Sequence, residues 1–325
     1  MITLRHHLLS LIAVFLALGI GVVTGTSFVS PGTITALEGS LRKLGDLNGD
    51  LRREVADLRR RNELLGQFAT ASKEMLIRDV LADQPLVMVS FESTSTKTRD
   101  ELSQTLLQAG SRLEGSVVLP GTMDFESGDR REQVAAVLEA ASPDPDSLRT
   151  ALVSQLAAAL SGREPGTLQR LVDAGLAGMT EAPGGKGKPP SQLVAAGSAL
   201  VVLAPAQRPR PDSHLGDQFL VPLVRFLVSS SVLVAVAEDG AGPLPTLAPL
   251  RGESGLRVIT VDGIDQPMGH VALVLGLRAA SAGRFGNYGT GEGATLLIPD
   301  MRFSGGRPSP PPGFRERPET GDRVP

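Results

Sequence analysis

The first apolar feature of the chain is an uninterrupted run near its amino terminus. Residues 8–29, LLSLIAVFLALGIGVVTGTSFV, include no charged side chain. As a helix, this run is long enough to cross about 30 Å of hydrocarbon. The alternative is a cleaved secretory signal, whose apolar region is typically about 7 to 15 residues, and TGTS at 24–27 is compatible with cleavage. The length of the run favours a transmembrane signal anchor over residues 1–30.

The basic residues around this run predict its orientation. Arg5 and the amino terminus lie on the short side, and the next basic residues are Arg42 and Lys43. By the positive-inside rule, the amino terminus stays in the cytoplasm. The sequence therefore predicts a single-pass protein of the cell membrane whose bulk is extracytoplasmic.

A second pattern follows, in which apolar positions recur at alternating spacings of four and three residues. The positions are Leu37, Leu41, Leu44, Asn48, Leu51, Val55, Leu58, Asn62 and Leu65. This 4-3 spacing is typical of a coiled coil, with leucine at every d position. We expect a coiled-coil helix over residues 33–80. The alternative is an amphipathic helix that folds back on its own domain.

Two asparagines in this seam indicate which kind of partner it meets. Asn48 and Asn62 occupy a positions, where a buried asparagine lowers stability but pairs with its equivalent in a parallel, in-register dimer. Glu54 at g and Arg59 at the following e would face each other across the same dimer. The pattern predicts a parallel homodimer through residues 37–65, with these four residues specifying register and orientation.

From residue 85 onward, short apolar runs alternate with helical stretches. Strands are predicted at 86–91, 116–120, 198–205, 231–238, 256–263 and 294–299, and helices at 99–110, 129–141, 146–161, 167–179, 217–229 and 267–282. Strands that are apolar on both faces and separated by helices are typical of a mostly parallel sheet covered on both sides. We therefore expect an α/β domain over 85–300 with a Rossmann-like or flavodoxin-like layout. The remaining segment, 304–325, has too little apolar surface to fold and is predicted to be disordered.

Composition narrows the function classes. The chain has 325 residues, is 41% hydrophobic and carries a net charge of -3, so no basic excess points to nucleic acid. Cysteine is absent, which excludes disulfides, thiolate metal sites and cysteine nucleophiles. Neither GxSxG nor HExxH occurs, so we expect no enzyme and no catalytic residue.

Candidate cofactor and metal sites are sparse. The first strand-to-helix turn, ESTSTKTRD, contains no glycine for a phosphate, and the run GNYGTGEG at 286–293 is better explained as a mobile loop. Asp212, His214 and Asp217 form the most compact set of potential metal ligands, although Asp217 is equally well explained as a helix N-cap. His270 lies in an apolar helix and is predicted to be a packed residue. The seven methionines show no clustering of the kind that copper sites use. We expect no bound cofactor and no metal site.

The order of these parts resembles a known family. The segment MITLRHHLLSLIAVFLALGIGVVTGT, a heptad helix directly after it, and GHVALVLGLRAASAGRFGNYGTGEGATLLIP are similar to the actinobacterial MctB family of copper transport proteins. The resemblance covers nearly the whole chain, and NYGTGEGATLLIP is among its most specific parts. It implies an envelope protein tied to copper efflux or homeostasis, described in the family as an outer-membrane channel. A corynebacterial branch resembles coiled-coil envelope proteins that act with a second membrane protein in cell-wall hydrolase control and division.

Two hypotheses follow. The resemblance implies a role in copper transport, with copper as cargo. The residues by themselves favour a dimeric, membrane-anchored interaction module. They do not fit a channel, because the strands are short, uniformly apolar and interleaved with helices. A transmembrane barrel instead needs strands of about 9 to 11 residues that alternate apolar and polar positions.

Overall fold

The computed structural model describes residues 3–27, 31–120, 128–180, 188–195, 197–205, 215–240 and 246–300. Its contacts divide the chain into two compact units, Met1–Gln67 and Phe68–Pro325. The predicted tail at 304–325 and the metal candidates Asp212 and His214 lie outside the described residues. Each unit is described by itself below.

The first unit is helical. Helix α1 spans Thr3–Ser27, and its stretch Arg5–Gly25 has a mean hydropathy of 2.5 with none of its surface buried inside the molecule. Among the described residues, this is the one helix long and apolar enough to cross a membrane. Helix α2, Pro31–Ile77, is continuous over 47 residues, which corresponds to a helix length of about 70 Å. Its final residues, from Phe68 onward, belong to the second unit.

The second unit is built on a seven-stranded sheet in the order β3-β2-β1-β4-β5-β6-β7. The strands are β1 Pro85–Phe91, β2 Arg112–Leu119, β3 Gly178–Thr180, β4 Ala199–Ala204, β5 Val234–Glu238, β6 Ile259–Val261 and β7 Gly286–Tyr288. All pairings are parallel except that of β2 with β3. The expected α/β fold with a mostly parallel sheet is confirmed.

The central strands are apolar on both faces because each face has its own core. Along β1, Val87, Val89 and Phe91 enter one core, whereas Leu86 and Met88 enter the other. Every residue of β4 is buried. This two-sided burial explains why the strands are near-continuous apolar runs in the sequence.

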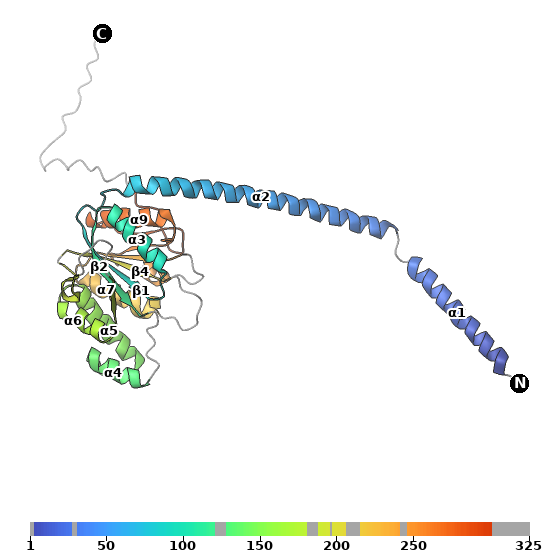
Figure 1. Cartoon of the computed structure of the whole chain (residues 1–325), viewed down its shortest axis with the longest axis horizontal. Coiled ribbons are helices and arrows are strands. Elements are labelled where there is room, and N and C mark those ends of the chain that lie inside the picture. The colour runs from blue at the N-terminus through green and yellow to red at the C-terminus, as the bar shows by residue number, and fades with distance from the viewer. Residues whose placement is uncertain are drawn as a thin grey trace, which may run out of the picture. The chain divides into compact units, whose positions relative to one another are not determined.

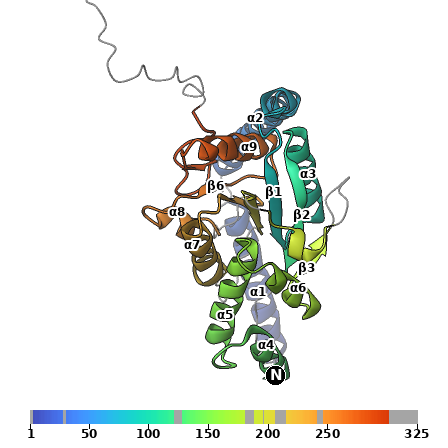
Figure 2. The same cartoon turned by 90° about the vertical axis from the view of Figure 1, so that its left-hand side faces the viewer.

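Helices cover both faces, as Figures 1 and 2 show. On one face lie α4 Gly128–Leu138, α5 Pro145–Leu160, α6 Pro165–Asp173, η2 Leu215–Leu220, α7 Val221–Ser229 and α8 Ala248–Gly252. On the other lie α3 Thr96–Gln108, α9 Pro267–Ser281 and the end of α2. A short 3-10 turn, η1, spans Pro190–Gln192. Helix α9 is buried along most of its length, and a Cβ atom at Gly269 would lie 2.2 Å from the Gly263 carbonyl oxygen, so α9 requires glycine there.

Three sequence predictions are wrong in detail. The run 294–299 forms no regular strand: it makes an isolated bridge from Leu296 to Tyr288, and strand β7 lies instead in the glycine-rich run. The helix predicted at 167–179 ends at Asp173 because Gly175 adopts a φ of 67°, which frees the next residues to form β3. Asp217 lies inside η2, so it is not the N-cap of the helix that follows.

Candidate functional site

The carboxyl edge of the sheet is the first place to look for a ligand. The strand order reverses between β1 and β4, and ligands of doubly wound folds bind in the crevice beyond such a reversal. Here Thr98, in the first turns of α3, donates from Oγ1 to Asp239 Oδ1 at 3.1 Å. Burial raises the pKa of Asp239, while the Thr98 hydrogen bond acts in the opposite direction. The beginning of α3, which holds phosphate in many such folds, already has a carboxylate of the protein beside it.

A second carboxylate occupies the glycine-rich run. Asp262 follows β6 and accepts hydrogen bonds from the amides of Thr290, at 2.8 Å, and Gly291, at 3.0 Å. Successive amides that converge in this way form an anion-binding cradle. A Cβ atom at Gly289 would lie 2.2 Å from Asp262 Oδ1, so the close approach requires glycine. The run 286–293 was expected to be a mobile loop, but its backbone is held by a buried carboxylate.

Arg251 of α8 completes this arrangement. Its Nη2 donates to Asp262 Oδ2 at 2.8 Å and to the Tyr288 carbonyl at 2.9 Å. Nη1 donates to the Glu292 carbonyl at 2.8 Å, and Nε donates to Thr260 Oγ1 at 2.9 Å. The side chain of Arg251 is 2% exposed and that of Asp262 is 9% exposed. We call this pair and the loop 286–293 the Arg251–Asp262 hub.

Sequence reasoning missed the hub. An acidic residue between a strand and a glycine is visible in VDG at 261–263, but the arginine lies in a five-residue helix without any distinctive pattern.

Glu238, at the end of β5, is a further buried acid at this edge. It is 1% exposed, accepts from the Thr246 amide at 2.8 Å, and has its pKa raised by burial.

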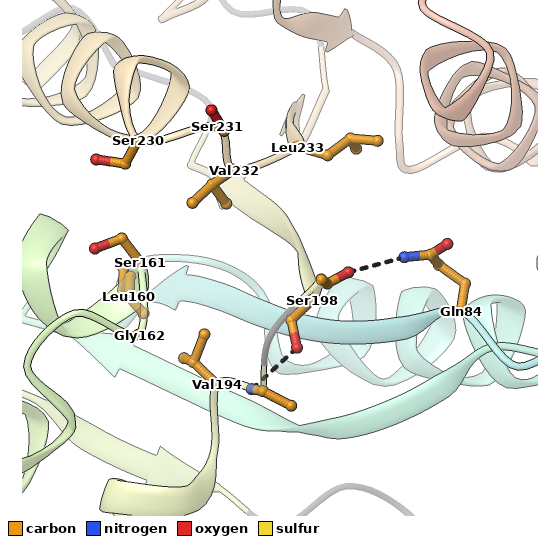
Figure 3. A pocket seen from close by; sticks show the side chains of 12 residues that line it. Gln84, Leu160, Ser161, Gly162, Val194, Ser198, Ser230, Ser231, Val232 and Leu233 are labelled. Carbon is orange, nitrogen blue, oxygen red and sulfur yellow. Dashed lines mark hydrogen bonds between the residues drawn. The ribbon is translucent and has the colours of Figure 1, made fainter.

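A pocket lies at the opposite, amino-terminal edge of the sheet (Figure 3). Its volume is about 280 Å³. It is bounded by Gln84 before β1, Ser198 before β4, and Ser161 and Ser230 after α5 and α7. Gln84 Nε2 donates to the Gly197 carbonyl at 3.3 Å. The lining residues are neutral and include no sulfur or imidazole ligand, so the pocket offers nothing of the kind that copper prefers.

The residues singled out in the sequence lie in different parts of the structure. Asn48, Glu54, Arg59 and Asn62 are exposed on α2, together with the leucines of the seam, such as Leu65 at 66% exposure. The pairing of this seam with a second chain stays a prediction. His270 is 4% exposed, which confirms that it is a packed residue. Within the described ranges, no three acidic or histidine side chains gather into a potential metal site.

Replacement of Asp262 by asparagine should destabilise the α/β domain. The variant leaves Arg251 buried without its counter-charge, a change that typically costs about 3 to 5 kcal/mol. Urea denaturation should therefore show a lower free energy of unfolding, and limited proteolysis should cut the variant within 286–293. The matched control is Arg225→Ala, which removes an exposed ion pair with Glu253 and should cost less than about 1 kcal/mol. Equal stability of Asp262→Asn and the parent chain would show that the hub is not a structural constraint.

The sequence is similar to known proteins along most of its length. A family model described as "Copper transport outer membrane protein, MctB" matches residues 1–299. The protein named "Copper transporter MctB" of Mycobacterium tuberculosis is 27% identical over 314 residues, which cover 90% of this chain and 98% of that protein. Its namesake in Mycobacterium leprae is 27% identical over 327 residues, covering 91% and 99%. Because the family match extends through the apolar helix, the long second helix and the α/β domain, the chain belongs to the MctB family.

Proposed function

We propose that this chain is a membrane-anchored envelope protein that acts in copper transport. The observation that carries the proposal is the family match across residues 1–299, together with relatives named copper transporters that align over about their whole length. The comparisons favour this role over a coiled-coil scaffold for cell-wall hydrolase and division control that has no transport activity. The arrangement of the chain supports attachment to a membrane by α1.

The described residues suggest that the α/β domain is not itself the copper carrier. The chain has no cysteine, the pocket is lined by neutral oxygen and aliphatic groups, and the two anion-binding features at the carboxyl edge contact carboxylates of the protein. Copper favours imidazole and sulfur ligands over isolated hydroxyl groups. We infer that the domain contributes by positioning or by contact with other envelope components, including a second membrane protein.

The seam of α2 supports a dimeric form of this assembly. Large apolar side chains line one face of the helix and stay exposed in the single chain: Leu37, Leu41, Leu44, Leu51, Val55, Leu58 and Leu65. A regular apolar stripe of this kind is typically covered by a partner helix. Asn48 and Asn62 at a positions, with Glu54 at g and Arg59 at the following e, favour a second copy in parallel, so we propose a homodimer through residues 37–65.

Copper content of cells tests the function. Cells that lack the protein should contain more copper than the parent strain when grown in copper-supplemented medium, and the intact gene should restore the parental level. Mass spectrometry of washed cells measures the effect. The variant Asp212→Asn, His214→Gln, Asp217→Asn should restore copper content as well as the parent does, because we assign no copper site to these residues. Equal copper content and equal copper tolerance with and without the protein would contradict a role in copper transport.

The orientation of the anchor has its own test. A reporter enzyme that is active only outside the cytoplasm, fused after Pro325, should be active because Arg5 keeps the amino terminus inside. Carbonate extraction should leave the protein in the membrane fraction. Recovery of a shortened, soluble form would show that residues 1–30 are a cleaved signal.

Replacing both seam asparagines with leucine should raise thermal stability and reduce specificity. A peptide of residues 33–85 should be a dimer by analytical ultracentrifugation. The Asn48→Leu, Asn62→Leu variant should melt at a higher temperature and form trimers or larger species, because no buried polar group then penalises other registers.

The control for this experiment changes outward-facing positions instead. Arg53→Leu and Arg60→Leu lie at f positions, farthest from the seam, and should leave the peptide dimeric. A parent peptide that stays monomeric at high micromolar concentration would mean that the seam does not join two copies of the chain.

A further inference from the structure

The end of α2 is attached to the α/β domain by two different contacts. Ile77 is fully buried in the core shared with α3 and α9. One helical turn earlier, Lys73 is half-buried and donates from Nζ to Thr105 Oγ1 of α3 at 3.2 Å. The same Nζ lies 3.4 Å from Nδ1 of His270 on α9. An apolar anchor is therefore preceded by a polar contact that joins three helices.

In this polar contact Lys73 and His270 both approach the hydroxyl oxygen of Thr105, whose own proton is donated to the Glu101 carbonyl at 2.9 Å. Thr105 Oγ1 lies 2.8 Å from His270 Nδ1. The Lys73 ammonium can only donate, so a neutral ring with its proton on Nε2 accepts from it at Nδ1 without adding a second charge. Nε2 is buried without a hydrogen-bond partner among the described residues. A protonated Nδ1 can still donate to Thr105 Oγ1, but it no longer accepts from Lys73 and places a second positive charge 3.4 Å from the ammonium.

Burial of the imidazole also favours the neutral form. Burial is the main cause that lowers the pKa of His270 to about 4, and the nearby Lys73 ammonium lowers it further. Glu101 of α3 and Asp265, which precedes α9, oppose this shift without cancelling it. The folded state thus holds His270 neutral at a pH where a solvated histidine is already partly charged.

Of the three residues, Lys73 is held least firmly. Thr105 is fully buried, and its helix is held in the core by Leu102 and Leu106. His270 lies on α9, which is buried along most of its length. Around Lys73, the residues of α2 that face the domain are the small, half-buried Ala69 and Ser72.

We propose that Lys73, Thr105 and His270 form a proton-sensitive latch, which holds residues 68–76 of α2 on α3 and α9 while His270 is neutral and releases them when His270 is protonated. Ile77 remains the anchor in both states. Release therefore shortens the docked part of α2 by about two to three helical turns.

The direction of the pH effect on docking follows from the difference between the pKa of His270 in the docked state and in the released state. Because the docked state has the lower pKa, the released state binds more protons between about pH 4 and 6.5. Docking is complete above this window and weakens as the pH falls through it. Acidification therefore loosens the latch, and alkaline conditions leave it unchanged.

Hydrogen–deuterium exchange of the full chain in detergent micelles tests the latch. After correction for intrinsic rates, amides of 68–76 should exchange roughly tenfold faster at pH 5 than at pH 7, while amides of β1 and β4 stay equally protected. The variant His270→Gln, which retains an acceptor but does not titrate, should abolish this pH dependence. The matched control His6→Gln, His7→Gln should respond as the parent chain does.

Several outcomes would overturn the proposal. Equal protection of 68–76 at both pH values in the parent chain is one, and unchanged pH dependence in His270→Gln is another. If His270→Gln does not fold, NMR measurement of the His270 pKa in the parent chain tests the proposal instead. A pKa of 6 or above would contradict the latch. In Lys73→Met, which keeps most of the aliphatic stem and removes the ammonium, that pKa should rise.

Discussion

The buried ion pair between Arg251 and Asp262 determines how the last third of the α/β domain closes. A charge taken out of water is costly unless it is paired and hydrogen-bonded, so each partner needs the other and the groups around them. Arg251 reaches the carbonyls of Tyr288 and Glu292, and Asp262 receives the amides of Thr290 and Gly291. These contacts join α8, β6 and the residues after β7. The edge strand β7, only three residues long, is held by its pairing with β6 and by the hydrogen bond from Arg251 to the Tyr288 carbonyl.

The same principle explains how this sheet differs from nucleotide-binding sheets of similar layout. Two of its features, the beginning of α3 and the glycine-rich cradle, would attract a phosphate by their amide and hydroxyl groups. Asp239 contacts the first and Asp262 fills the second. An internal carboxylate in each place stabilises the fold and repels an incoming anion. The carboxyl edge of this sheet therefore places carboxylates of the protein where nucleotide-binding sheets present free amides.

The long helix α2 combines two kinds of contact along its length. Its leucine seam is apolar, exposed and regular, so it favours association with another helix. Its final turns instead combine one buried isoleucine with a polar cluster in which protonation of His270 would place a second positive charge beside Lys73. Apolar contacts are insensitive to pH, whereas the Lys73 contact depends on a neutral imidazole. The helix therefore has a permanent attachment at Ile77 and a conditional one at Lys73.

The sequence by itself determined the features that depend on local periodicity. The apolar run of α1, the heptad spacing of α2 and the two-sided apolar strands β1, β4 and β5 are visible without coordinates, because burial imposes a repeat on neighbouring residues. It was also sufficient to place most helices of the α/β domain within a few residues. Tertiary structure alone decided the contacts between residues far apart in the chain. Arg251 donates to the Glu292 carbonyl, and Lys73 contacts His270. These residues are too far apart in the sequence for a periodic pattern to predict their contact. The glycine-rich run illustrates the difference: its composition indicated freedom of the backbone, and only the buried carboxylate of Asp262 explains why that freedom is used for close packing.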